Sequence, residues 1–437
     1  MRVFGTTGAA PASAPVRVTF DDESFSLATP GAPPLIGAYR DVTALIAQPG
    51  ALLLVLGDGD EATRVSLEGF GERQGGLQRD LRERRTRQRL RDRMVQLDPD
   101  PLEVVEYRIG AEHGVAELAF QPWAAELVPV DESRDLAHLR RSEIGAVIPA
   151  AESGALRVER AADAPAVELL GLGSAATRLA QRFSRLRDGA TLDAAALVGA
   201  LLPDAPFGTR QRLASLLVDG RPASIGDLGE DADRLEGAVL SEPTFAESYR
   251  SLVKRAEAGD PAAGRWFALA PASPGGSEAK AWYFVALPGN LLALELVSAG
   301  AHATYLFRVV PRAAYAGEPA SSLGLALSGA VSEISNALID ARFLREPMAL
   351  PDTQLASARY GHYRVALAAL PSLASARRRF AARLVHDDPT RWAAALDELI
   401  DWHASARDDA AEWPGRGAQE DVIVAASGEA PDQMSGS

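Results

Sequence analysis

The sequence contains no cysteine, and this absence sets the first limits on its chemistry. Disulfide bonds, thiolate nucleophiles and thiolate metal sites are excluded. Lysine is almost as scarce, because it occurs only at Lys254 and Lys280 and arginine supplies nearly all the positive charge. Abundant arginine and alanine are typical of a GC-rich bacterial genome, so the arginine content by itself indicates no particular partner.

Long apolar runs are also missing. A membrane-spanning helix needs about 20 predominantly apolar residues, and the sequence offers no such run. The start, "MRVFGTTGAAPASAPVRVTF", has no apolar core of a signal peptide, so we expect residues 1–15 to form a disordered lead. The net charge of −14 argues against general attraction to nucleic acid or anionic lipid. Together these features predict a cytoplasmic protein.

Sequence motifs for catalysis or cofactor binding are absent as well. The glycines at 69, 71 and 75 in "GFGERQG" do not fit the spacing of a dinucleotide-binding turn, and no lysine follows as in a phosphate-binding loop. No metal-ligand spacing occurs around the histidines, which are His113, His138, His302, His362, His386 and His403. We therefore predict no cofactor, no metal site and no catalytic residue, although an enzyme is not excluded.

An internal repeat is present instead. Residues 41–85 align without a gap on residues 143–187, with apolar and glycine positions in the same order. The matched apolar pairs are Val42/Ile144, Ile46/Ile148, Leu54/Leu156, Val65/Val167, Leu67/Leu169, Leu77/Leu179 and Leu81/Phe183. The matched glycine pairs are Gly69/Gly171 and Gly71/Gly173.

Each copy reads as a run of short strands followed by one helix. Apolar residues alternate over four to eight positions, and turn residues such as "DDES" and "GDGDE" separate these runs, which is typical of antiparallel strands. Apolar residues four apart then predict amphipathic helices over residues 71–93 and 174–187. The glycines fall between the last strand and the helix, where we expect a structural joint.

This pattern resembles the pleckstrin-homology-like (PH-like, or GRAM-type) fold, in two tandem copies at residues 16–97 and 102–190. The resemblance implies an α+β protein with antiparallel barrels, each closed by a C-terminal helix. It also implies an adaptor or scaffold role, because such modules bind peptides, proteins or lipid headgroups.

The predicted helix of the first copy is strongly basic. One interpretation is a solvated face that pairs with acidic groups elsewhere in the protein. Another is a binding surface for an acidic partner protein or lipid headgroup, for which we select Arg79, Arg82, Arg85 and Arg89. Nucleic acid is the least favoured ligand, because no aromatic residues are interleaved for base stacking.

The second half of the chain is less regular. Residues 191–262 have helical periodicity, and residues 263–345 show four strands and a helix, either a third PH-like unit or an α+β domain of its own. Residues 352–410 predict a helical bundle, including a helix over "SLASARRRFAARLVHDD", residues 372–388. We expect residues 411–437 to be a disordered tail.

The sequence thus favours a non-catalytic scaffold whose PH-like modules engage a protein partner. One alternative is an enzyme or small-ligand-binding protein, with a pocket between the 265–312 sheet and the C-terminal helices that uses Tyr360, His362 or His386. A second alternative is peripheral binding to anionic lipid. The identity of the partner and the oligomeric state are left open.

Overall fold

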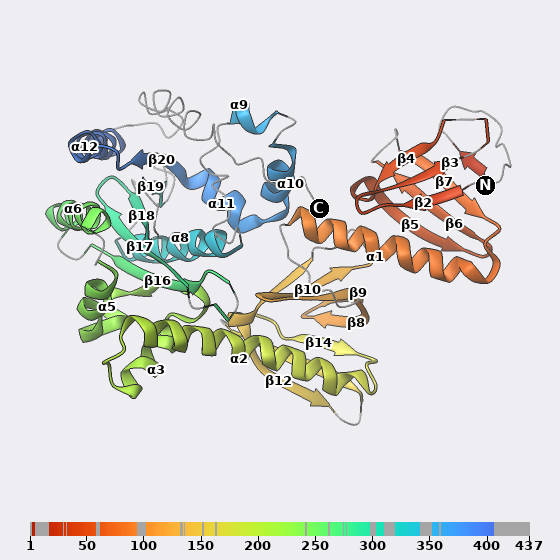
Figure 1. The fold of residues 1–437 in the computed structure, drawn as a ribbon, viewed down its shortest axis with the longest axis horizontal. Coiled ribbons are helices and arrows are strands. Elements are labelled where there is room, and N and C mark those ends of the chain that lie inside the picture. Colours follow the sequence, from red (N-terminus) through yellow and green to blue (C-terminus); the bar gives the residue numbers. More distant parts are fainter. Residues whose placement is uncertain are drawn as a thin grey trace, which may run out of the picture. The chain divides into compact units, whose positions relative to one another are not determined.

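The computed structural model divides the chain into two compact units, residues 1–187 and residues 188–437. Both contain antiparallel sheets and helices, which confirms the predicted α+β class (Figure 1). The structure describes residues 2–4, 17–28, 30–31, 33–57, 62–93, 102–131, 134, 136–150, 153–161, 164–240, 243–260, 263–273, 275–276, 278–297, 303–309, 320–340, 352–357 and 360–405. The predicted tail at residues 411–437 lies outside them.

The first half of unit 1 forms two small sheets. Its strands are β1 (Arg2–Phe4), β2 (Arg17–Phe20), β3 (Ser24–Ala28), β4 (Leu35–Ala38), β5 (Val42–Gln48), β6 (Ala51–Leu56) and β7 (Thr63–Glu68). Strands β2, β3 and β4 make one sheet, and the other has the order β1-β7-β6-β5. Helix α1 (Gln74–Asp92) follows β7. Strand β1 lies within the predicted disordered lead, but the structure pairs it with β7.

The second half of unit 1 forms one sheet. Its strands are β8 (Glu103–Ile109), β9 (Glu112–Gln121), β10 (Ala124–Pro129), β11 (Ala137–Arg140), β12 (Ile144–Ala150), β13 (Ala155–Arg160) and β14 (Val167–Leu170). The order is β11-β10-β9-β8-β14-β13-β12, so β11 and β12 are opposite edges. The predicted closed barrels are therefore not seen among the described residues. Strands β11 and β12 are joined through a 3-10 turn, Arg141–Glu143, and do not pair with each other.

The two halves of unit 1 follow the same plan, as the repeat predicts. In both, a 3-10 turn precedes an edge strand with a bulge, then a hairpin, then a helix. The matched leucines Leu54 and Leu156 are both fully buried, and so are the valines Val65 and Val167. Because burial repeats at the aligned positions, the repeat reflects two similar cores.

The glycines between the last strand and the helix form a joint. The backbone φ angles are +88° and +52° at Gly69 and Gly71, and +65° and +53° at Gly171 and Gly173. Residues with a Cβ rarely adopt these angles, because the Cβ approaches the neighbouring carbonyl oxygen. The joint brings the following helix back onto its sheet. Leu81 of α1 is buried there in the first core, as Phe183 of α2 (Ala175–Leu201) is in the second.

Unit 2 is built around one six-stranded antiparallel sheet. Its strands, in sheet order, are β15 (Ala223–Ser224), β16 (Arg265–Pro271), β17 (Ala279–Leu287), β18 (Leu291–Val297), β19 (Ala303–Arg308) and β20 (Phe380–Val385). Its helices are the C-terminal part of α2, then α3 (Phe207–Leu216), α4 (Ile225–Leu228), α5 (Ala232–Val239), α6 (Pro243–Gly259), α8 (Ala320–Asp340), α9 (Asp352–Leu355), α10 (Gly361–Ala369), α11 (Pro371–Arg379) and α12 (Pro389–Ser405).

Helices cover both faces of this sheet. Tyr283 of β17 packs with Tyr249 of α6 on one face, their ring centroids 4.5 Å apart. Its neighbour Trp282 points to the other face, where its Nε1 donates to Ser335 Oγ of α8 at 3.1 Å. Successive side chains of β17 point to opposite faces of the sheet, so one strand contacts α6 on one face and α8 on the other. The sheet is therefore a buried central layer.

Two elements of the second half differ from the sequence-based expectation. The helix predicted to end near residue 187 continues without interruption to Leu201. The helix predicted over residues 372–388 ends at Arg379, and Phe380–Val385 form strand β20. Strand β20 pairs with β19 and completes the edge of the sheet, so tertiary pairing overrides the local helical propensity. Of the described helices, none combines the length and apolarity needed to cross a bilayer.

Candidate functional site

Helix α1 carries the predicted basic surface and packs on both halves of unit 1. Leu81 lies in the core of the first half. About two and a half turns later, Leu90 is fully buried against Ala119 of β9 and Val128 of β10. These two residues lie on the outer face of the second sheet, since their strand neighbours face its core. The helix therefore plugs one sheet and lies on the outside of the other.

Three of the four selected arginines are directed toward this second sheet. Arg82 Nε donates to Glu117 Oε1 of β9 at 2.7 Å, and Glu117 is only 2% exposed. The pKa of Arg85 is lowered to about 10, mainly by burial and also by the Arg89 charge, while the Glu117 charge opposes the shift. Burial likewise lowers the pKa of Arg89, whose Nη1 donates to the Pro129 carbonyl at 3.4 Å. Only Arg79 is exposed.

Other arginines of α1 bind the first half of unit 1. Arg84 Nη1 donates to the carbonyl oxygen of Asp21 at 2.9 Å, and Arg91 Nη1 donates to that of Asp22 at 2.8 Å. Much of the basic run is thus engaged by acceptors within the same unit. This arrangement corresponds to the first interpretation of the sequence, in which the helix pairs with the protein itself.

The acceptors on the second sheet were not singled out from the sequence. Glu117 and Glu126 are both almost fully buried, and each stands between an alanine and a leucine. Glu126 Oε1 accepts from Gln121 Nε2 at 2.5 Å and lies 2.6 Å from His138 Nδ1. An isolated carboxylate in an apolar strand is a signal that a cation or donor must come from elsewhere.

The edge strands β5 and β12 form a second candidate surface. Each ends its sheet, and among the described residues no strand pairs with its outer side. Strand β5, "VTALIAQ", and strand β12, "IGAVIPA", contain no charged residue. Ile46 and Ile148, which are matched in the repeat, are 46% and 49% exposed. Uncharged edges with exposed apolar residues are templates for pairing with another chain.

Strand β5 is the better template of the two. Pro149 in β12 lacks a backbone N–H, whereas β5 contains no proline. At one end of β5, Gln74 Nε2 of α1 donates to the carbonyl oxygens of Gln48 and Ala51, at 2.8 and 2.7 Å. The side chain of Gln74 thus ties the β5–β6 hairpin to the start of α1. We call Val42–Gln48 the β5 edge.

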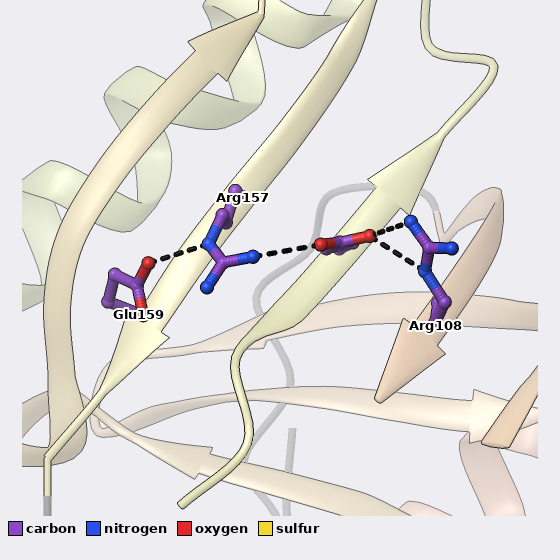
Figure 2. Close-up of polar contacts among 4 residues, drawn as sticks. Arg108, Arg157 and Glu159 are labelled. Carbon is purple, nitrogen blue, oxygen red and sulfur yellow. Dashed lines mark hydrogen bonds and ion pairs between the residues drawn. The ribbon is translucent and has the colours of Figure 1, made fainter. Parts of the chain in front are cut away.

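Charges occupy the exposed face of the neighbouring strands in the second sheet. Figure 2 shows Arg108 of β8 and Arg157 of β13 on either side of a carboxylate of β14, which belongs to Glu168. Arg157 Nε also donates to Glu159 Oε1 at 2.6 Å. The hydrogen bond from Arg108 is the main cause that lowers the pKa of Glu168. These charges keep that face solvated, while the adjacent edge strand β12 carries none.

In unit 2, the residues selected for an enzyme pocket are separated. His386 follows β20 and lines a cavity with residues of α6 and α12. Tyr360 lies beside Tyr363, with ring centroids 5.9 Å apart, and is not among the residues that line this cavity. The side chain of His362 lies outside the described part of the chain. Of the three, only His386 is placed at a candidate site.

Comparison with known proteins adds no relative from which a site could be transferred. No protein-family profile matches the chain, and no curated protein matches it. The candidate surfaces are therefore defined by the geometry of this chain alone.

Proposed function

We propose that the protein is a binding scaffold whose two PH-like modules in unit 1 engage a protein partner. The strand order of the second sheet and the C-terminal helix of each half support the resemblance to PH-like modules. The fold alone does not fix a partner, so the proposal depends on a surface.

The observation that carries this proposal is the uncharged β5 edge, with whose outer side no strand of the described part of the chain pairs. An extended segment of a partner can add to such an edge through main-chain hydrogen bonds, and side-chain contacts then provide selectivity. Ile46, almost half exposed, offers an apolar contact at the middle of the strand. Natural edges are often protected by charged residues or proline, and the β5 edge contains neither, which favours a use in binding.

Rigid support of the edge favours this mode of binding. Gln74 holds the β5–β6 hairpin to α1, and α1 is anchored in turn by Leu81 and by Leu90. A strand that is ordered before binding loses little conformational entropy when a partner adds to it. The Arg82–Glu117 ion pair then acts to hold the two halves of unit 1 together, and the partner-binding surface lies on a different element.

The test is to place a charge on the edge. We expect Ile46→Lys to reduce recovery of protein partners from the native host about tenfold or more, because a desolvated lysine is costly in a paired sheet. The matched control is Leu192→Lys, which changes a leucine that is 68% exposed on helix α2. A recovered partner should also protect the backbone amides of residues 42–48 from hydrogen exchange.

Equal recovery by the wild type, Ile46→Lys and Leu192→Lys would remove the β5 edge as the site. Protection confined to β12 in the complex would transfer the proposal to the second module. Protection confined to α1 around Arg79 would instead support the basic-surface hypothesis.

A further inference from the structure

The buried side of helix α8 continues toward the N-terminal end of the helix, where it meets a cavity of unit 2. Val331 and Ser335 on this side are at most 1% exposed, and Ser335 accepts a hydrogen bond from Trp282 of the sheet. Gly324 and Ser328 stand seven residues earlier and therefore share the same side of the helix. Both are exposed, and both line the cavity. The core-facing side of α8 thus begins over an open space within unit 2.

This cavity has a volume of about 660 Å³, within the usual range for small-molecule sites. Its other walls are formed by the end of α6, the start of β16 and the turn between β17 and β18. Of the sixteen described residues that line it, nine have apolar side chains and four are glycine. The remaining three are Asp260, Asn290 and Ser328. The walls therefore offer a ligand mainly apolar contact.

Two glycines allow bulky side chains to form these walls. A Cβ at Gly264 would overlap the ring of Trp266, and a Cβ at Gly259 would overlap the ring of Pro288. The indole of Trp266 can therefore lie directly on the backbone, and the end of α6 can lie against the β17–β18 turn. Trp266 lines the cavity and is only partly buried, so part of its ring is left for contact with a ligand.

Few charged groups of the described residues lie at this cavity. Asp260 is the only charged side chain among the described lining residues, and it is exposed. Arg379 donates to the carbonyl oxygen of Val309 in the cavity wall, but its Nε also donates to Glu333 Oε2 at 3.0 Å, so its charge is paired. Moving a charged ligand from water to predominantly apolar walls costs free energy. The cavity is therefore better suited to an uncharged ligand.

We propose that this cavity binds an uncharged aromatic small molecule. An aromatic ring of the ligand packs on the indole of Trp266, since aromatic pairs add attraction beyond the area that they bury. Pro288 and Leu327 supply further apolar contact, as is typical of small-molecule sites. The site gives unit 2 a ligand-binding role that is independent of strand addition in unit 1.

Titration of the full chain with N-phenyl-1-naphthylamine tests the proposal, because the fluorescence of this uncharged aromatic probe rises when it leaves water. We expect saturable binding. A Cβ at Gly324 meets no atom within 4 Å, so Gly324→Trp places an indole in the cavity. This variant should bind the probe at least about tenfold more weakly, because its own indole takes the place of the ligand ring.

Gly329→Trp is the matched control and should leave binding unchanged. Gly329 lies in the same helix, but it faces away from the cavity, and a Cβ there also meets no atom within 4 Å. Thermal unfolding verifies that each variant is folded. If Gly324→Trp does not fold, Gly324→Leu and Gly329→Leu make the same comparison, with an expected loss of about threefold at Gly324.

Absence of saturable binding to the wild type would overturn the proposal, as would equal binding by the Gly324 and Gly329 variants. Tighter binding of the sulfonated analogue, 1-anilinonaphthalene-8-sulfonate, than of the uncharged probe would also overturn it, because the ligand would then be an anion. Loss of partner binding through the β5 edge would not affect any of these outcomes.

Discussion

Glu117 is the residue on which the placement of the basic helix depends most directly. It is buried at the α1 surface, pairs with Arg82 and opposes the lowering of the pKa of Arg85 and Arg89. Glu168 also lies between arginines, but Arg108 and Arg157 are half exposed there, with side-chain exposures of 55% and 50%. The two carboxylates therefore have similar partners in different dielectric surroundings.

Neutralising these two carboxylates should have unequal effects on stability. Glu117→Gln should lower the free energy of unfolding by about 1–3 kcal/mol, because arginines beside it would keep buried charge without a counterion. Glu168→Gln should cost less than about 1 kcal/mol, since water screens its exposed partners. Denaturant unfolding of the full chain, followed for the transition of unit 1, measures both. Equal losses of unfolding free energy would show that the contact of Glu117 with α1 is as well solvated as the contacts of Glu168 with Arg108 and Arg157.

At the scale of elements, the features that could be predicted from the sequence are those that depend on the residue itself or on its near neighbours in the chain. The aligned glycines were interpretable as a joint because their requirement for positive φ is a property of the residue itself. The matched apolar positions, such as Leu54 and Leu156, revealed two similar cores because burial follows the strand period. The glycine joint, the matched core positions and the helix after each run of strands could therefore be predicted before any coordinates, whereas β1 was missed in the predicted disordered lead.

Pairings between distant segments could not be predicted in this way. Residues 380–385, "FAARLV", have the composition of a helix, and they form β20 because the edge of β19 accepts them. Burial alternates at Ala382 and Leu384, but the sequence does not show this pattern, because Arg383 is the one polar residue among the six. The acceptor of Arg82 was missed for the same reason, because Glu117 is 35 residues away in the sequence. The hydrogen bonds of Thr304 in β19 likewise join distant segments, since its partners are Glu295 of β18, His386 after β20 and Trp392 of α12.

The glycine joint gives a test at this scale. Gly173→Ala should destabilise the protein by about 1–2 kcal/mol, because alanine is strained at φ +53°. Gly189→Ala, within helix α2, should stabilise it by about 0.5–1 kcal/mol through helix propensity. A Cβ at either position meets no atom within 4 Å, so only the backbone conformation distinguishes them. A shift of the unfolding temperature in the same direction for both variants would contradict the requirement for positive φ at the joint.

At the scale of the whole molecule, the boundary between the two units falls inside a helix. Helix α2 runs from Ala175 to Leu201, and the units divide after Arg187. Its N-terminal part buries Leu179 and Phe183 in the core of unit 1. Its C-terminal part buries Leu197 and other residues in the core of unit 2. One continuous helix thus contributes residues to both cores.

This sharing predicts where the chain can be cut. A fragment of residues 188–437 keeps Leu197, Val198 and Leu202, which are buried in unit 2, and should unfold in one cooperative transition. A fragment of residues 203–437 lacks all three. Removing one large buried side chain lowers the free energy of unfolding by about 2–5 kcal/mol. The sum over the three residues therefore approaches the whole stability of a typical domain. We expect the shorter fragment to show no cooperative transition by circular dichroism. If it unfolded like the longer one, α2 would be dispensable to unit 2, and the second core would have to be defined without it.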